Sequence, residues 1–378
     1  MPLALTGARV FDGAHILEGR AVVIGNGRIL AVPHERDLGA DMERRRIEGL
    51  LAPGFIDVQV NGGGGALFND ARNVDGLRTI AAAHRAYGTT GLLPTFITDT
   101  RERMAEAMDA VRDALAARVP GVLGIHVEGP FINPERKGVH NPSFMRPMEE
   151  EDIAILTSLK GGRTLVTLAP ERTGMDAVAR LASAGVLLCA GHTAGDYATI
   201  MEACRHGLRG FTHLYNAMPP LAGRDPGPVG AALDSQDTWC GLIVDGHHVS
   251  AAALRIAIAA KGPERMMLVT DAMSVTGTDL ASFKLHGRTI YRKDGRLTTE
   301  DGTLAGSDLD MAGAVRNTVR ALGLSLPDAL RMASLHPAAF LKLDHELGRI
   351  APGYRASLVL LDEDLQVRDT WIDGEAQV

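Results

Sequence analysis

The chain has 378 residues, of which 46% are hydrophobic and 22% are charged, and its formal net charge is −7. This composition is ordinary for a soluble globular enzyme, and the length allows one large domain of about 250 residues with a smaller domain beside it. The negative charge argues against a general polyanion-binding surface, so any anionic ligand would need a local cluster of positive groups.

Cysteine usage and the lack of long apolar runs predict a cytoplasmic protein. Cys189, Cys204 and Cys240 form no CxxC pair, which argues against a disulfide framework and fits a reducing compartment. The opening stretch, MPLALTGARVFDG, has too short an apolar core for a signal peptide. No run approaches the roughly 18 apolar residues of a membrane span, so none is predicted.

Both ends of the chain have the pattern of short β-strands. The N-terminal region contains LALTGARVF, AVVIGNG and RILAV, with Asn26-Gly27 as a hairpin signal. The tail contains the strand-like segments ASLVLLD and VRDTWIDG. Because chain termini often lie close together, we expect residues 1–51 plus 346–378 to form a small β-sandwich domain. Residues 52–345 would then form the catalytic domain.

Between the two ends, eight short apolar runs alternate with helix-like segments. Residues 74–88 and 101–119 show apolar residues at three- and four-residue spacing, which is typical of amphipathic helices. Eight continuous apolar strands that alternate with helices favour an α/β fold of the (β/α)8 TIM-barrel type. A doubly wound sheet is the competing fold, but NGGGGA after the first run lacks G-x-G-x-x-G spacing. The runs are GFIDVQV, GLLPTFIT, VLGIHVEG, TLVTLAP, GVLLCAGHT, GFTHLYN, CGLIVDG and MMLVTDAM.

Ionisable residues gather at the C-terminal ends of these predicted strands. In a (β/α)8 barrel such ends surround one mouth, where active sites lie. The third run ends with His126 and Glu128, the fifth with His192, the sixth with His213 and Asn216, the seventh with Asp245, His247 and His248, and the eighth with Asp271.

One glutamate and two histidines from different strands would provide three ligands and an open position, the set that a catalytic divalent metal uses. Each histidine alone is equally well explained as a hydrogen-bonded core or surface residue. Four ionisable groups at four strand ends are harder to explain in that way, because charged residues are rarely buried without a partner or metal. Asp271 is a candidate general base, although TDAMS also suits a helix N-cap or an ion pair.

Two loops carry further polar candidates. His140, in GVHNP, follows the third strand and could polarise a carbonyl, hold a substrate hydroxyl, or simply face solvent. Arg224, in PLAGRDPGP, could clamp an anion, because the planar guanidinium donates two parallel hydrogen bonds to phosphate. It could equally be a surface charge in a Pro/Gly-rich loop.

Taken together, these motifs resemble the N-acetylglucosamine-6-phosphate deacetylases of the amidohydrolase superfamily. The similarity runs in order from about residue 50 to residue 310, and the flanking strands are similar to that family's small β domain. The segments that carry it are GFIDVQVNGGGG, GIHVEGPFINPERKGVHNP, CAGHT, FTHLYNAMPPLAGRDPG, GLIVDGHHV, LVTDAM and DGTLAGS.

The resemblance implies a role for individual residues. Glu128, His192 and His213 would bind one divalent metal ion per subunit, with zinc the first expectation and iron, manganese or cobalt also compatible with this ligand set. Asp271 would be the acid/base, and His140 would polarise the acetamide carbonyl. The sugar phosphate would be held by Asn216, Ala217, Arg224 and His248. In this family the arginine can come from the neighbouring subunit of a homodimer, and Leu304 would line the pocket near the acetyl group.

The end of the first strand departs from a common superfamily pattern. Many members have His-x-His there and bind two metals, whereas this chain has Gln59-Val60-Asn61. A neutral amide binds a divalent ion far less well than imidazole does, so Gln59 is expected to hydrogen-bond a metal-bound water. The fourth strand, TLVTLAPE, also lacks the lysine that bridges two metals in other relatives. Both features favour a single metal.

The resulting prediction is metal-dependent hydrolysis of N-acetyl-D-glucosamine 6-phosphate to D-glucosamine 6-phosphate and acetate. The nearest alternative is a deacetylase of the same superfamily that acts on N-acetylgalactosamine 6-phosphate or another N-acyl substrate. A non-catalytic barrel scaffold is the alternative from a different class. A nucleic-acid partner is not expected, because the sequence has no basic patch or stacking motif.

Overall fold

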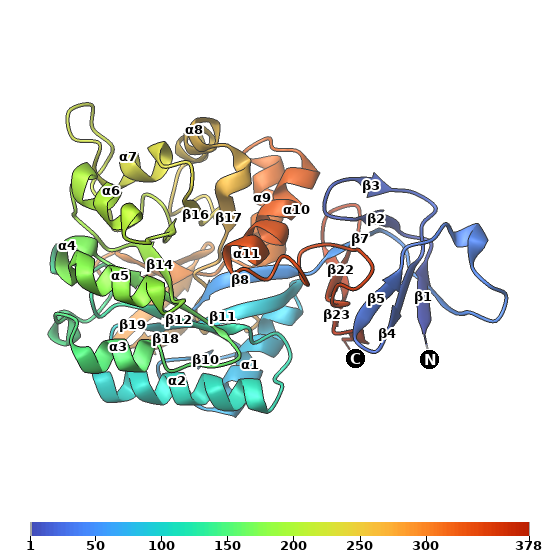
Figure 1. Ribbon diagram of the computed structural model, residues 1–378, viewed down its shortest axis with the longest axis horizontal. Coiled ribbons are helices and arrows are strands. Elements are labelled where there is room, and N and C mark those ends of the chain that lie inside the picture. The colour runs from blue at the N-terminus through green and yellow to red at the C-terminus, as the bar shows by residue number, and fades with distance from the viewer. Residues whose placement is uncertain (1, 378) are drawn as a thin grey trace.

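The computed structural model describes residues 2–377 and contains a sheet of eight parallel strands that curls into a barrel (Figure 1). Neighbouring strands pair in chain order, and a parallel bridge between Val60 and Ala272 joins the end of the eighth strand to the first. The predicted (β/α)8 barrel is therefore confirmed, and the doubly wound alternative is wrong. The barrel strands are β8 (Phe55–Val60), β11 (Thr89–Ile97), β12 (Gly124–Glu128), β13 (Arg163–Leu168), β14 (Leu187–Ala190), β15 (Gly210–Phe211), β16 (Trp239–Leu242) and β17 (Met266–Leu268).

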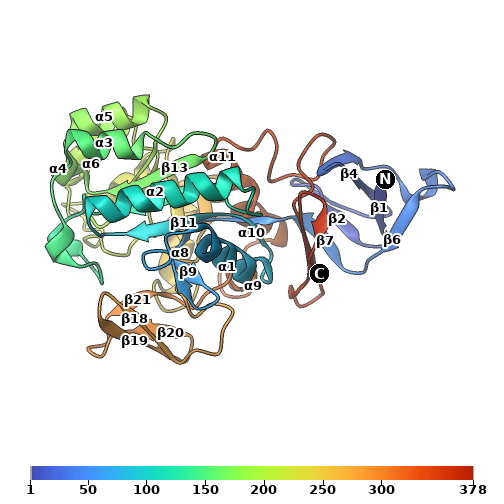
Figure 2. The ribbon, with the colours of Figure 1, turned by 90° about the horizontal axis from the view of Figure 1, so that it is seen from below.

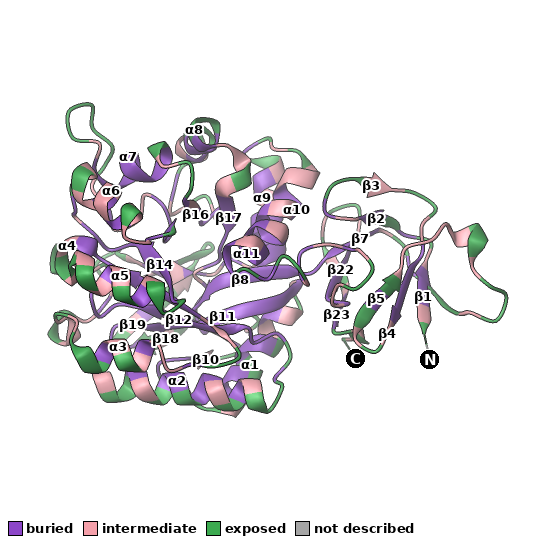
Figure 3. Cartoon of the chain, viewed as in Figure 1, coloured by how far each residue is buried: buried purple, intermediate pink, exposed green. Residues whose placement is uncertain are grey.

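Helices cover the outside of the barrel and turn their polar faces to solvent (Figure 3). The helices expected at 74–88 and 101–119 are α1 and α2. Each begins at a side-chain N-cap, because Asn73 accepts from Gly76 N and Thr100 accepts from Arg103 N. Within residues 2–377, no helix has both the length and the apolarity needed to cross a membrane. The helices are α1 (Val74–Arg85), α2 (Arg101–Ala116), α3 (Glu150–Leu156), α4 (Pro170–Thr173), α5 (Met175–Ser183), α6 (Tyr197–Arg205), α7 (Gly227–Asp234), α8 (Ala251–Lys261), α9 (Met311–Arg320), α10 (Leu326–Ala333) and α11 (Leu335–Phe340).

Strands from both ends of the chain build two further sheets beside the barrel, with a shared core that includes Leu5, Ile24 and Trp371 (Figure 1). The central strand β7 pairs with β2 from the N-terminal region and with β22 from the tail. The division of the domains at residues 51 and 346 stays a prediction, and β7 itself continues past residue 51. One sheet has the order β5 (Arg28–Ala31), β4 (Val22–Gly25), β1 (Leu3–Thr6), β6 (Glu43–Arg46); the other has β24 (Glu375–Ala376), β23 (Val367–Ile372), β22 (Leu358–Leu361), β7 (Leu50–Pro53), β2 (Arg9–Phe11), β3 (Ile16–Leu17).

A small antiparallel sheet that the sequence did not predict follows the eighth barrel strand and stands apart from the helices (Figure 2). Its strands are β18 (Ser282–Leu285), β19 (Arg288–Lys293), β20 (Arg296–Thr298) and β21 (Leu304–Ser307). Buried Leu285, Ile290 and Leu297 pack with Met273 and Ile97 and anchor this sheet to the barrel mouth. The short ribbon of β9 (Gly62–Gly63) and β10 (Ala66–Leu67) lies beside it and holds the glycine-rich loop in place.

His84 of α1 is buried beneath this glycine-rich loop. Its Nε2 lies 2.8 Å from the carbonyl oxygen of Gly62, which can only accept, so Nε2 carries the proton. Within the described residues Nδ1 is buried without a hydrogen-bond partner. Burial lowers the pKa of His84 from 6.5 to about 4, so the folded protein holds this imidazole neutral.

His84 is therefore expected to make the fold sensitive to acid. Between pH 6.5 and pH 4 the unfolded chain binds a proton here that the folded chain does not, so stability falls as pH decreases. The loss between pH 7 and pH 5 amounts to about 2 kcal/mol. Urea unfolding at these two pH values should show a smaller loss in His84→Gln than in the wild type. Substituting the exposed His15 by Gln is the control; an equal loss in all three proteins would contradict the prediction.

Candidate active site

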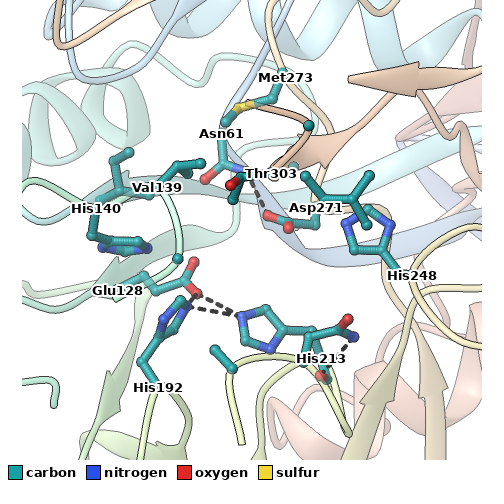
Figure 4. Close-up of a pocket in the computed structure, with 17 residues that line it drawn as sticks. Asn61, Glu128, Val139, His140, His192, His213, His248, Asp271, Met273 and Thr303 are labelled. Atoms are coloured by element: carbon teal, nitrogen blue, oxygen red, sulfur yellow. Dashed lines mark hydrogen bonds and ion pairs between the residues drawn. The ribbon is translucent and has the colours of Figure 1, made fainter. Parts of the chain in front are cut away.

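A cavity of about 380 Å³ opens at the carboxyl ends of the barrel strands (Figure 4). It collects polar side chains from several strands, and it is also lined by Thr303, which precedes β21, and by Leu304, the first residue of β21. The predicted site residues that line it are Glu128, His140, His192, His213, Asn216, Ala217, His248, Asp271 and Leu304.

Glu128, His192 and His213 converge at the base of this cavity (Figure 4). The Nε2 atoms of both histidines lie 3.0 Å from Oε1 of Glu128 and 3.1 Å from each other. All three residues are buried. Burial alone would raise the pKa of Glu128, but the two imidazoles outweigh it and hold the pKa well below its usual value. The group is therefore a buried anionic centre with two imidazole neighbours.

The protonation pattern of His192 indicates what this centre is built to hold. Its Nδ1 lies 2.7 Å from the carbonyl oxygen of Arg136, which can only accept, so the proton of a neutral ring sits on Nδ1. In that neutral ring Nε2 presents a lone pair toward Glu128 and His213, as a metal ligand must. A tetrahedral ion with bonds of about 2.0–2.1 Å separates its ligands by about 3.3 Å. The donor set and its spacing thus fit a divalent metal ion.

His140 lies next to this centre. A ring nitrogen of His140, one of His192 and a carboxylate oxygen of Glu128 all lie within 4.8 Å of one another, so His140 also could ligate a metal. Its Nδ1 is 2.7 Å from the hydroxyl of Thr98, which leaves Nε2 as the free nitrogen. The shorter separations at His213 make Glu128, His192 and His213 the better matched set, with His140 beside it.

The backbone at the site adopts a conformation that is uncommon for residues with a side chain. His192, His213 and Asp271 have φ values of 49°, 32° and 55°. This left-handed region costs about 1–2 kcal/mol per residue, and such strain concentrates at functional sites. Backbone hydrogen bonds hold it in place: Asp271 N donates to Gln59 O at 3.0 Å, and His192 O accepts from Asn133 N at 2.9 Å.

Asp271 faces the centre from the opposite wall of the cavity (Figure 4). Asn61 donates to its Oδ1 from 2.6 Å, and Gln59 donates to the same oxygen from 3.2 Å. Burial, together with the charge of Glu128, raises the pKa of Asp271 to about 6. A carboxyl group with a pKa near neutrality can both take up and release a proton, as a general acid/base must.

Gln59 connects the two carboxylates. Its amide nitrogen donates to Oε2 of Glu128 at 3.1 Å and to Oδ1 of Asp271 at 3.2 Å. One NH₂ group thereby satisfies two buried anions, which accounts for an amide at this strand end. Gln59 lies below the cavity rather than in its wall. Its predicted contact with a metal-bound water stays a prediction.

Replacing Gln59 with Glu should impair the site. A third carboxylate at this position repels both neighbours and raises their pKa values. We expect kcat at neutral pH to fall by roughly tenfold or more, with the melting temperature also lowered. The exposed Gln236→Glu is the matched control for added charge. Steady-state kinetics on both variants checks this prediction. An unchanged kcat in Gln59→Glu would show that the hydrogen bonds from Gln59 to Glu128 and Asp271 do not contribute to turnover.

Of the remaining predicted residues, four line the cavity and Arg224 lies outside it. Asn216, Ala217 and His248 line the cavity, as does Leu304, the first residue of β21. Arg224 does not reach the cavity of its own chain. It is exposed on the loop between β15 and α7, which projects from the molecule (Figure 1). The structure of one chain thus does not bring Arg224 together with the other candidates.

Sequence reasoning gave no role to several residues at the site. Asn61 lies two residues after Gln59 and so faces the same side of the strand, a signal that could have assigned it to Asp271. Thr98 directly follows β11, and its hydroxyl contacts Nδ1 of His140. Thr303 and Met273 belong to the small sheet and its approach, and no pattern marked them as cavity residues.

With the site described, comparison with known proteins identifies its class. The amidohydrolase family model matches residues 50–376, and the NagA composite domain matches residues 3–51. The chain belongs to the amidohydrolase family. It is 42% identical to the N-acetylgalactosamine-6-phosphate deacetylase of Shewanella sp. (strain ANA-3), an alignment that covers 99% of this chain and 95% of that protein. It is 34% identical to the N-acetylglucosamine-6-phosphate deacetylase of Haemophilus influenzae, covering 99% of both.

Solved structures show the same fold over the whole chain. The N-acetylglucosamine-6-phosphate deacetylase of Pasteurella multocida superposes with a TM-score of 0.96 at 34% identity and covers 100% of both chains. A mutant of the Mycobacterium smegmatis deacetylase in complex with N-acetyl-D-glucosamine-6-phosphate superposes with a TM-score of 0.90 at 33% identity. That alignment covers 100% of this chain and 98% of the other.

Proposed function

We propose that the protein hydrolyses the acetamide of N-acetyl-D-glucosamine 6-phosphate to D-glucosamine 6-phosphate and acetate. The observation that carries this proposal is the convergence of Glu128, His192 and His213 within 3.0–3.1 Å in a cavity that also holds Asp271. Full-length similarity to deacetylases of 6-phosphorylated N-acetylhexosamines supports the substrate class.

In this proposal Glu128, His192 and His213 are the metal ligands. A divalent ion bound there would supply Lewis acidity to the acetamide carbonyl and would lower the pKa of an attacking water. His192 is held in its ligating tautomer by the carbonyl of Arg136. His140 can donate from Nε2 to the carbonyl oxygen when the Thr98 hydroxyl donates to its Nδ1.

In this proposal Asp271 transfers a proton from the attacking water to the leaving nitrogen. Its carboxylate accepts a proton from the water that attacks the acetyl carbon, and it then donates that proton to the nitrogen as the carbon–nitrogen bond breaks. A pKa raised to about 6 suits both halves of this cycle. Asn61 and Gln59 fix the direction of the carboxylate through their hydrogen bonds.

The other proposed contacts surround the sugar. Asn216, Ala217 and His248 would hold the phosphate on the side of the cavity away from Glu128, and Leu304 would contact the acetyl group. Because Arg224 is exposed outside its own cavity, its predicted phosphate contact requires a second copy of the chain, which supports a homodimer. Zinc as the native metal suits the two imidazoles and one carboxylate. Location in the cytoplasm is supported by free Cys189, Cys204 and Cys240.

Hydrolysis of N-acetyl-D-galactosamine 6-phosphate is the second candidate function. The 42% identity to the Shewanella deacetylase, against 34% to the Haemophilus deacetylase, supports it. The two substrates share the acetamide and the phosphate, and the same hydrolysis would act on both. They differ in the configuration at C4.

The test is acetate release from each epimeric phosphosugar by the metal-loaded enzyme. The proposal expects release from N-acetyl-D-glucosamine 6-phosphate, and the ratio of the two kcat/KM values assigns the preferred epimer. A metal-loaded protein that releases acetate from neither would overturn the proposed function and favour a non-catalytic scaffold.

A further inference from the structure

A phosphate group in this cavity would need positive charge, and the cavity wall supplies little. Among the described residues 2–377, those that line the cavity include no lysine or arginine. His140, His192 and His213 lie around Glu128. His248 is thus the lining residue on the far side of Asp271 that can carry a positive charge (Figure 4).

His248 is coupled to an acidic residue that sequence reasoning left without a role. Nδ1 of His248 lies 2.6 Å from Oδ2 of Asp245, and both side chains are at most 7% exposed. The other carboxylate oxygen, Oδ1, accepts the backbone N–H groups of His247 and His248 at 2.8 and 2.9 Å. Both oxygens of Asp245 therefore have hydrogen-bond partners. The carboxylate cannot rotate without losing its hydrogen bonds to the backbone of His247 and His248.

The surroundings of Asp245 favour its ionised form. Burial alone would raise the pKa of Asp245, but the hydrogen bonds and charge of His248 outweigh it and hold that pKa below its usual value. An ionised carboxylate can only accept, so Nδ1 of His248 carries a proton and Nε2 is the nitrogen left for the cavity. In a neutral ring Nε2 would direct a lone pair at a phosphate oxygen, whereas in an imidazolium it donates. Because Nδ1–H is committed to Asp245, His248 can donate to a phosphate oxygen from Nε2 only as a ring that carries both protons.

We propose that Asp245 is a positioning residue that holds His248 as an imidazolium whose Nε2–H binds the phosphate of the substrate. This inference deepens the proposed function and rests on it for the identity of the anion. Asp245 fixes the direction of the ring through Nδ1 and places a negative charge on the side of the ring away from the phosphate. His248 is also close enough to Asp271 to influence that carboxyl group, so the imidazolium lies between two carboxylates and the phosphate.

Asp245→Asn tests the inference, because the asparagine oxygen can keep the two backbone hydrogen bonds while its NH₂ group donates to Nδ1 and leaves His248 a neutral ring. We expect KM for the phosphosugar to rise about 10-fold, because the neutral ring still donates from Nε2 but without its positive charge, with kcat within about threefold of wild type. kcat/KM for phosphate-free N-acetyl-D-glucosamine should not change. His247→Asn is the matched control, since His247 lies beside His248 and outside the cavity wall.

Calorimetric binding of glucosamine 6-phosphate to the metal-loaded wild type and Asp245→Asn separates this inference from the proposed function, because it needs no turnover. A dissociation constant about 10-fold higher in the variant, at equal metal content and melting temperature, supports the inference even if no acetate is released. Equal affinities in the two proteins overturn it. An equal loss of kcat/KM for the phosphorylated and phosphate-free sugars also overturns it, because that result shows a purely structural role.

Discussion

Asp271→Asn is expected to lower kcat by roughly a hundred- to ten-thousandfold, the range that a general acid/base contributes. Asparagine preserves the shape of the side chain and one oxygen that can accept from Asn61, but it cannot take up the proton of the attacking water. The hydrogen bonds of Asp271 go to Asn61 and Gln59 rather than to Glu128, His192 or His213, so metal content should stay close to that of the wild type.

The comparison needs kcat and metal content from the same preparations. Asp234→Asn, an exposed aspartate at the end of α7, controls for the substitution itself and should behave as the wild type. Loss of metal in Asp271→Asn would assign Asp271 a ligating role instead. Wild-type turnover in that variant would exclude Asp271 as the acid/base.

Glu128→Gln is expected to lower metal affinity by about a hundredfold or more, the upper range for losing an important group at a metal site, and to reduce acetate release to background. The substitution keeps the volume but removes the only anionic member of the proposed ligand set Glu128, His192 and His213. Metal-free protein should also lose stability in this variant. Without an ion, the two imidazoles stabilise the buried Glu128 carboxylate, so the neutral variant, which loses that interaction, should melt at a lower temperature.

Elemental analysis after dialysis against a graded series of chelator concentrations measures the first effect, and thermal melting of metal-free samples measures the second. The exposed Glu135→Gln, in the loop that leads to His140, is the matched control. Retention of metal by Glu128→Gln at wild-type chelator concentrations would contradict the ligand assignment.

The barrel was predictable because its strands are buried on both faces. All six residues of β8 and all nine of β11 are buried, so each strand appears in the sequence as a mainly apolar run. The residues at the strand ends could be placed at one mouth for the same reason: parallel strands bring their carboxyl ends together. The order of polar residues along the chain is therefore enough to predict a shared site for Glu128, His192, His213 and Asp271.

The contacts that tune the site were not predictable from local pattern. Gln59 contacts residues 69 and 212 positions away in the chain, and the strand pattern alone does not show that one amide serves two carboxylates. The small sheet of β18–β21 was missed because its strands are mostly exposed; β19 buries only Ile290 among its six residues. Such strands lack the apolar runs that revealed the barrel, yet the small sheet supplies Leu304 of β21 and the adjoining Thr303 to the cavity.

The central claim is that Glu128, His192 and His213 hold one divalent ion at which Asp271 deacetylates a phosphosugar. Metal-free enzyme titrated with zinc, with acetate release from N-acetyl-D-glucosamine 6-phosphate measured at each step, tests it most directly. The rate should begin at background, rise in proportion to added metal and reach its maximum at one equivalent per chain. Undiminished acetate release from the metal-free enzyme, or a maximum reached only at two equivalents, would contradict it.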